Sequence, residues 1–219
     1  CQMPVANFDM DAYLQTVDMV HICGIALSLT DTTVESALTL AKKAHEQGKK
    51  VCFDFNFRPS LNTQLDKKQL MKERYEQILP YCDIVFGSKR DLIELLQLPQ
   101  QEEIPLIQQF LKEYGIEYFA GTKRQTIDEK RMQKGYLITQ NAQVESKAWS
   151  VEMLDRIGAG DAFAAGILLG YTNNWHLQET VDFSITNAVL KQTIYGDVPL
   201  TSIELVQQVM ENPNLDIIR

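Results

Sequence analysis

Two glycines followed by an aspartate are the residues whose types and spacing best fit a chemical role. Gly158 and Gly160 precede Asp161, and a run of small apolar residues over 162–171 predicts a buried helix. The glycines would let a ligand approach the backbone where the first N–H groups of that helix lack internal partners. Those groups and the helix dipole favour an anion such as phosphate. A carboxylate there can accept a proton from a hydroxyl group attacking the phosphate. The alternative is an ordinary turn with an acidic helix cap.

A second polar group lies at the end of a strand predicted over 51–57. Because side chains alternate along a strand, Asp54, Asn56 and Arg58 should share one face, with phenylalanines on the other. Ligands of open α/β sheets bind at the carboxyl ends of the strands, and Arg58 can offer a fork of donors to a carboxylate or phosphate. The alternative is a strand end that turns polar as it meets water.

The elements that must position these residues alternate along the chain. Further strands are predicted over 17–23, 83–86 and 116–120, and helices over 31–48, 65–79, 91–98, 102–114, 176–191 and 201–210. Strands separated by such helices indicate a parallel sheet covered on both faces. The runs 135–139 and 143–149 predict an antiparallel hairpin at the sheet edge.

Composition restricts the class of protein. The 219 residues, 45% of them hydrophobic, are about one domain's worth and can bury a sizeable core. The net charge of -8 argues against a nucleic-acid partner. No apolar run approaches the roughly 20 residues that span a bilayer, and no leader opens the chain, so we expect a cytoplasmic protein without a membrane partner. The four cysteines lack metal-type spacing, and we expect reduced thiols.

The stretch 155–168, D-R-I-G-A-G-D-A-F-A-A-G-I-L, resembles the carboxy-terminal signature of the ribokinase-like (PfkB-type) carbohydrate kinases. In that family the last aspartate of the signature is the catalytic base, and the Gly-Ala-Gly turn forms an anion hole for the transferring phosphate. The resemblance therefore implies Asp161 as the base and Gly158, Ala159 and Gly160 as donors. Arg156 stands where the pattern usually has a small residue, as in some members that act on sugar acids.

The string D-F-N-F-R over 54–58 resembles the D-x-N-x-R motif of the same family, especially of the 2-keto-3-deoxygluconate kinases. There the arginine is a ligand for the acidic sugar, so the resemblance implies substrate contacts from Asn56 and Arg58. Asp197, in the turn G-D-V-P, matches a position that contacts substrate in the sugar-acid kinases. An aspartate after a glycine is also common in a turn without such a role.

Other positions correspond to the nucleotide side of the family. Asn187 lies on the helix that borders the adenine pocket, although a solvent-facing side chain is equally consistent with the sequence. Thr122 or Lys123 could face the nucleotide phosphates, where the family has a lysine and a glycine-rich turn; the alternative is a solvated loop. The N-x-x-E motif, which organises magnesium and phosphates, is replaced by S-K-R-D over 88–91, leaving Asp91 as the expected metal contact.

The resemblance implies a ribokinase-like α/β fold, a three-layer αβα sandwich with a mainly parallel central sheet and an antiparallel edge hairpin. Residues 1–219 would form one nucleotide- and sugar-binding domain that lacks the family's amino-terminal strands and lid. The expected activity is ATP- and Mg²⁺-dependent phosphorylation of a sugar-acid hydroxyl, converting 2-keto-3-deoxygluconate to its 6-phosphate. We also expect a homo-oligomer, although the residues do not determine its state.

Three alternatives remain. The first is a kinase of the same family that acts on fructose, ribose or a nucleoside, against which Arg58 favours an acid. The second is a non-catalytic descendant that binds a sugar phosphate, supported by the altered 88–91 stretch and the missing lid. The third is a dinucleotide enzyme, but the glycine turn comes late in the chain and lacks the third glycine of that fingerprint.

Overall fold

The computed structural model describes residues 8–61, 67–150 and 153–212, which fold into helices and strands of the α/β class. The chain divides into two compact units. The first unit is formed by Cys1–Phe119 with Ile138–Ala142, and the second by Ala120–Leu137 with Gln143–Arg219.

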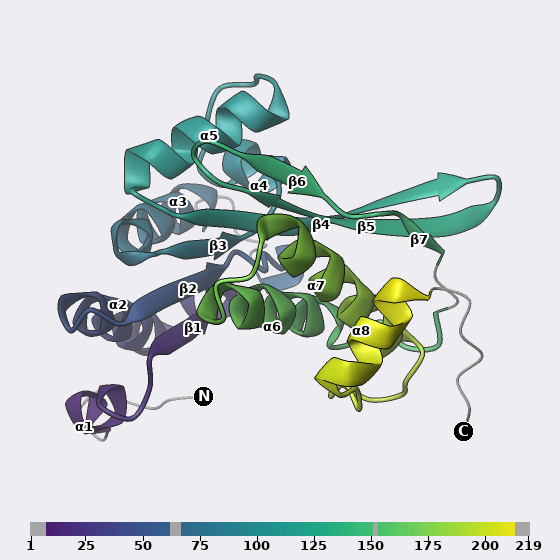
Figure 1. The fold of residues 1–219 in the computed structure, drawn as a ribbon. Coiled ribbons are helices and arrows are strands. Elements are labelled where there is room, and N and C mark those ends of the chain that lie inside the picture. The colour runs from purple at the N-terminus through teal and green to yellow at the C-terminus, as the bar shows by residue number, and fades with distance from the viewer. Residues whose placement is uncertain (1–7, 62–66, 151–152, 213–219) are drawn as a thin grey trace. The chain divides into compact units, whose positions relative to one another are not determined.

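Parallel strands form the sheet of the first unit. β1 (Met19–Cys23), β2 (Lys50–Asp54) and β3 (Ile84–Phe86) lie in that order, followed by the start of β4 (Tyr118–Ile127) (Figure 1). Cys23 pairs with Asp54, and Asp54 pairs with Phe86. The carboxyl ends of the three strands are therefore level, and the predicted parallel pairing is confirmed.

Helices precede and connect these strands, and all but the first correspond to helices predicted from the sequence. They are α1 (Met10–Leu14), α2 (Asp31–Glu46), α3 (Lys67–Ile78), α4 (Lys89–Glu94) and α5 (Glu103–Tyr114), with 3-10 turns η2 (Gly24–Leu27), η3 (Pro59–Leu61) and η4 (Leu79–Tyr81). α2 packs on β1 and β2. Its cap is Thr30, one residue before the predicted start, because the Thr30 hydroxyl accepts the N–H of Thr33 at 3.2 Å. Gly48, with φ +70°, follows its end.

Three aromatic rings form the centre of the core in the first unit. Phe53, Phe55 and Tyr75 are fully buried, and their centroids lie 5.1 to 5.9 Å apart in edge-to-face pairs. The hydroxyl group of Tyr75 is buried without a hydrogen-bond partner among the described residues. Burial raises the pKa of this hydroxyl, so the hydroxyl stays protonated. The ring of Tyr75 stabilises the core, whereas its hydroxyl group destabilises the folded state because it loses its hydrogen bonds to water.

We predict that Tyr75→Phe stabilises the protein by about 1 kcal/mol, because it removes a desolvated hydroxyl and keeps the ring. Urea unfolding measures the change. Tyr13→Phe is the matched control, since Tyr13 is 40% exposed and should change stability by less than about 0.5 kcal/mol. A loss of stability in Tyr75→Phe would contradict the unpaired state of the hydroxyl.

A long hairpin begins the second unit. β4 runs to Ile127 and turns through Asp128 and Glu129 into β5 (Lys130–Ile138), and both turn residues have positive φ, 48° and 64°. β6 (Gln143–Glu145) and β7 (Trp149–Ser150) both neighbour β5, and β7 runs antiparallel to it. The antiparallel hairpin predicted over 135–139 and 143–149 corresponds to the end of β5 with β6 and is confirmed, since the N–H of Thr139 donates to Ala142 and that of Ser146 to Gly135. The prediction that the preceding strand ends at residue 120 is wrong, because β4 continues for seven further residues.

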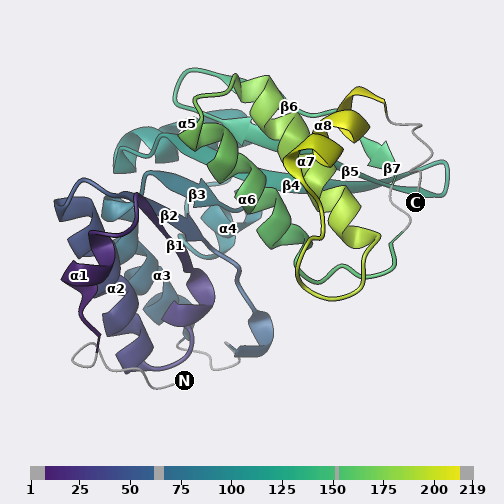
Figure 2. The ribbon, with the colours of Figure 1, turned by 60° about the horizontal axis from the view of Figure 1, so that its bottom comes forward.

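Helices follow the strands of the second unit. They are α6 (Ala159–Thr172), α7 (Leu177–Gln192) and α8 (Ile203–Glu211). α6 and α7 lie side by side (Figure 2). A Cβ on Gly166 would lie 2.6 Å from the Cα of Ser184, so the small residues of α6 permit this close packing. None of the helices in the described part of the chain has the length and apolar content needed to cross a membrane.

Candidate active site

The candidate substrate residues of the first unit follow β2. β2 ends at Asp54, and the backbone turns at Asn56, whose φ is +33°. The Asp54 Oδ1 accepts the N–H of Asn56 at 2.9 Å, which holds this turn. The predicted strand over 51–57 is therefore too long, and its strict alternation is wrong from Asn56 onward. Arg58 lies exposed at the start of the next loop.

Close backbone packing fixes the loops at this edge of the first unit. A Cβ on Gly24, directly after β1, would lie 2.3 Å from the carbonyl oxygen of Phe55. The amide of Asn56 also reaches β1, where its Nδ2 lies 3.3 Å from the Cys23 Sγ. A Cβ on Gly87, after β3, would lie 2.8 Å from the Phe55 ring. The loops after all three strands are thus held by one another.

The glycine turn of the second unit adopts a geometry suited to an anion. Gly158 caps α6 with φ +77°, and a Cβ there would lie 2.0 Å from the carbonyl oxygen of Asp197. Apart from its chain neighbours and the nearby backbone of its own helix, no atom of the described residues lies within 4 Å of the position of a Cβ on Gly160. This residue therefore faces open space in the described part of the chain. Asp161 is the third residue of the helix and is exposed. The structure therefore places Asp161 and Asp197 next to the same turn.

Ala159 differs from its neighbours in this turn. It is 3% exposed, and its N–H donates to the carbonyl oxygen of Arg156 at 3.3 Å. Whether Ala159 donates to an anion remains a prediction. Its N–H would then have to be shared between the anion and the Arg156 carbonyl oxygen. Gly160 and Asp161 lie in the first helical turn, where N–H groups lack intrahelical acceptors. The N–H groups of Gly160 and Asp161 are therefore better placed than that of Ala159 to donate to an anion.

A carboxylate and a buried ammonium hold the loop that carries Asp197. Asp155 Oδ1 accepts the N–H of Ile157 at 2.9 Å, and its Oδ2 accepts the N–H of Gly196 at 3.1 Å. These two bonds lower the pKa of Asp155 below its ordinary value of 3.8. Lys191 is fully buried and donates to the carbonyl oxygen of Ile194 at 3.0 Å. The sequence reasoning missed both supports, because their partners lie in a loop without a motif.

Asn187 supports the signature helix from α7. It is 8% exposed, its Nδ2 donates to the Ala162 carbonyl oxygen at 2.9 Å, and its Oδ1 accepts the Thr201 hydroxyl at 2.8 Å. The alternative of a solvent-facing side chain is therefore wrong. Its role as a nucleotide contact remains a prediction.

Comparison with known proteins identifies the family. Residues 2–197 match the family described as pfkB family carbohydrate kinase. The chain belongs to the PfkB family.

Three relatives of this PfkB chain are informative. A protein from Enterococcus faecalis, provisionally named a 2-keto-3-deoxygluconate kinase, is 52% identical with a TM-score of 0.94, over 99% of this chain and 65% of that one. A 2-dehydro-3-deoxygalactonokinase from Haloferax volcanii is 24% identical over 91% of this chain and 59% of its own length. A fructokinase from Xylella fastidiosa, solved with ATP, has the same fold at 21% identity, with a TM-score of 0.76 over 97% of this chain and 67% of that one. The chain spans about 60% of the length of its sugar-acid kinase relatives.

The expected phosphate contacts of this PfkB chain lie on a strand. Thr122 and Lys123 belong to β4, so the alternative of a solvated loop is wrong. The Lys123 ammonium lies 2.9 Å from Glu145 Oε1 and 5.1 Å from the centroid of the Tyr136 ring. Lys134 binds the same carboxylate, and these contacts lower the pKa of Glu145. Lys123 therefore already has an anionic partner, and its nucleotide role remains a prediction.

The altered S-K-R-D stretch forms a helix start. The Asp91 Oδ2 accepts both the N–H and the hydroxyl of Ser88, each at 2.7 Å. Burial raises the pKa of Asp91, while the bonds from Ser88 oppose this shift. Among the described residues, no group of three His, Cys, Asp or Glu side chains could hold a metal. The role of Asp91 as a metal contact remains a prediction.

We predict that Gly158→Ala destabilises the protein by about 2 kcal/mol or more, because a Cβ there meets backbone and the left-handed conformation disfavours alanine. Gly160→Ala, two residues later, is the control. Its methyl group enters open space in a helix, so stability should be unchanged or rise by up to about 1 kcal/mol. Urea unfolding of both variants gives the comparison. Equal stability of the two variants would refute the close contact with Asp197.

Asp155 predicts a specific acid dependence of stability. Because its pKa is depressed in the folded state, its contribution is fully present above pH 3.8 and is lost as pH falls through the folded pKa. The difference in urea midpoint between wild type and Asp155→Asn should therefore be constant above about pH 5 and shrink below about pH 4. A difference that stays constant down to pH 2.5 would show that this carboxylate makes no such bonds.

Proposed function

We propose that this protein is an ATP-dependent sugar-acid kinase that converts 2-keto-3-deoxygluconate to its 6-phosphate. The observation that carries the proposal is the signature turn, in which Gly160 leaves backbone open beside the exposed carboxylate of Asp161. The relatives from Enterococcus faecalis and Haloferax volcanii, both named as kinases of keto-deoxy sugar acids, support this substrate class.

The second unit would carry the chemistry of transfer. The N–H groups of Gly160 and Asp161, at the positive end of the α6 dipole, would stabilise the charge that develops on the transferring phosphoryl group. The carboxylate of Asp161 would orient the sugar hydroxyl and accept its proton. Phosphoryl transfer has a loose transition state, so positioning supplies much of the rate enhancement. The bonds of Asp155 and Asn187 hold this turn in place.

The substrate would be bound through its acid group. Arg58 is exposed and carries a guanidinium that can form paired hydrogen bonds with a carboxylate. Asn56, held in its turn by Asp54, would contribute an amide, and Asp197 a second carboxylate for sugar hydroxyl groups. An acid-binding arginine distinguishes this substrate from the neutral sugars used by other kinases of the family.

The nucleotide would be bound by the second unit, with contacts from Thr122, Lys123 and Asn187. Magnesium would neutralise the charge of the phosphates. It usually binds to substrate phosphates and water with only one or two protein carboxylates, so it would enter the site bound to the nucleotide. Asp91 already accepts two hydrogen bonds from Ser88, so it would act on magnesium through water.

The proposal extends to the whole protein. The two units would form one nucleotide- and sugar-binding domain, and the additional length of the relatives would supply the remaining strands and lid. We further propose a cytoplasmic homo-oligomer that binds small molecules and has no membrane partner. The net charge of -8 argues against a nucleic-acid partner.

A substrate panel tests the assignment. The full-length protein is assayed with ATP and magnesium on 2-keto-3-deoxygluconate, 2-keto-3-deoxygalactonate, fructose, ribose and a nucleoside. We expect the highest kcat/KM on a keto-deoxy sugar acid. A neutral sugar or nucleoside as the best substrate would replace this proposal by the alternative of a PfkB kinase that acts on fructose, ribose or a nucleoside. No turnover of any substrate would favour a non-catalytic binding protein.

We predict that Asp161→Asn lowers kcat by about 100-fold or more, because proton acceptance is lost while the shape of the side chain is kept. Substrate binding should change little, as measured by calorimetry. Asp128→Asn, in the exposed hairpin turn, is the control and should keep wild-type activity. An Asp161→Asn enzyme with near wild-type kcat would end the assignment of the base.

A further inference from the structure

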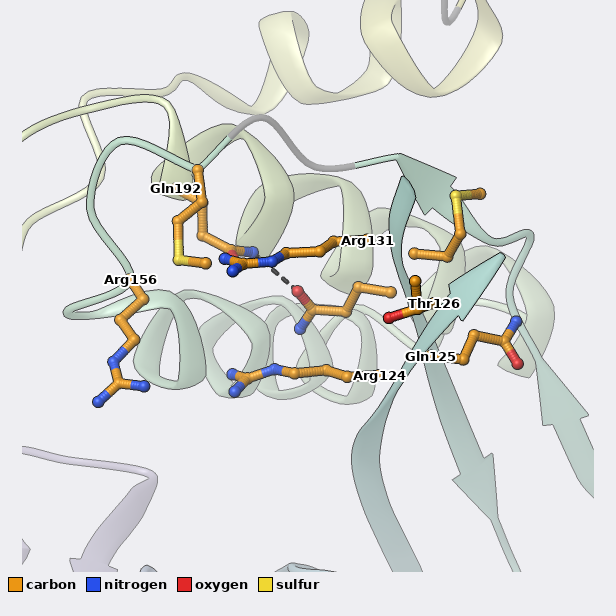
Figure 3. A pocket seen from close by; sticks show the side chains of 9 residues that line it. Arg124, Gln125, Thr126, Arg131, Arg156 and Gln192 are labelled. Carbon is orange, nitrogen blue, oxygen red and sulfur yellow. Dashed lines mark hydrogen bonds between the residues drawn. The ribbon is translucent and has the colours of Figure 1, made fainter. Parts of the chain in front are cut away.

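A pocket of about 500 Å³ lies entirely within the second unit, at the β4–β5 hairpin. Arg124 from β4, Arg131 from β5 and Arg156 from the signature line it together. Figure 3 shows the side chains of Arg124 and Arg131 extending from the hairpin toward the loop that carries Arg156. Three arginines that lie up to 32 positions apart in the sequence thus line the same pocket.

The charge of this pocket contrasts with that of the protein. The chain has a net charge of -8, yet the lining residues that the structure describes include three arginines and no aspartate or glutamate. Clustered cations without carboxylates repel one another, so an anion in the pocket would relieve this repulsion. Guanidinium forks match phosphate oxygens in pairs.

Neutral polar groups complete the wall of the pocket. Gln133 and Gln192 are 4% and 2% exposed, and the Gln192 Nε2 donates to the Gln133 Oε1 at 2.9 Å and to the Ala188 carbonyl at 3.1 Å. Two buried, mutually bonded amides keep this wall rigid. A volume of about 500 Å³ lies in the range of small-molecule sites and exceeds what one phosphate group needs.

We propose that this arginine pocket binds a polyphosphate anion, a ligand with two or more phosphoryl groups, through Arg124, Arg131 and Arg156. Such a ligand carries enough negative charge to balance three guanidinium groups and enough oxygens to pair with each. The ligand is either the phosphate chain of a nucleotide or a separate phosphorylated effector. In the first case the inference rests on the proposed function and adds three residues to its nucleotide site. In the second case it is independent of that function, because it requires binding and no phosphoryl transfer.

Calorimetry with tripolyphosphate, in the absence of sugar, tests the proposal. Arg124→Gln and Arg131→Gln should each weaken binding by about tenfold, and the double variant by about 100-fold, since each removes charged hydrogen bonds. Binding should also weaken as salt is raised. Lys130→Gln is the matched control, because this exposed lysine of the same hairpin does not line the pocket. Its affinity should stay within twofold of wild type.

Competition then identifies the source of the anion. Displacement of tripolyphosphate by ATP assigns the pocket to a nucleotide, and displacement by fructose 1,6-bisphosphate alone assigns it to an effector. The proposal is overturned if neither competes, if the double arginine variant binds like wild type, or if Lys130→Gln loses as much affinity as Arg131→Gln. Circular dichroism confirms that each variant is folded. A failed kinase assay does not affect this test, because calorimetry measures the binding of tripolyphosphate without turnover.

Discussion

The contact between Gly158 and the carbonyl oxygen of Asp197 is the constraint on which the candidate site of the second unit depends. No side chain fits between these two backbone segments, and the positive φ of Gly158 starts α6 in the orientation that leaves Gly160 open. The glycine usually associated with ligand approach here serves protein packing. Gly160, by contrast, keeps its backbone accessible.

Polar groups outside the proposed reaction maintain this contact. Asp155 joins the turn to the loop at Gly196, and Lys191 binds the same loop through the carbonyl oxygen of Ile194. Burying an ammonium is costly unless it is hydrogen-bonded, and the bond to Ile194 offsets part of this cost for the fully buried Lys191. Asn187 performs the corresponding task for the first turn of α6.

The sequence predicted those features that local patterns encode. The alternation of strands and helices, the parallel pairing of β1 to β3 and the helix after the glycine turn all follow from hydrophobic periodicity and helix signals. The β4–β5 hairpin escaped prediction because its turn is Asp128-Glu129, without the Asn-Gly signal of tight hairpins. The arginine pocket, and the contact of Gly158 with a residue 39 positions later, arise from tertiary packing that no short pattern records.

The packing of α6 on α7 couples distant residues to the geometry of the candidate site. A Cβ on Gly170 would lie 2.5 Å from the Thr180 hydroxyl, so any larger residue there forces α7 away. α7 carries both Asn187 and Lys191, and its displacement would loosen the turn and the loop at once. Variants at this helix crossing would therefore disturb the candidate site without changing any residue proposed to contact its ligands.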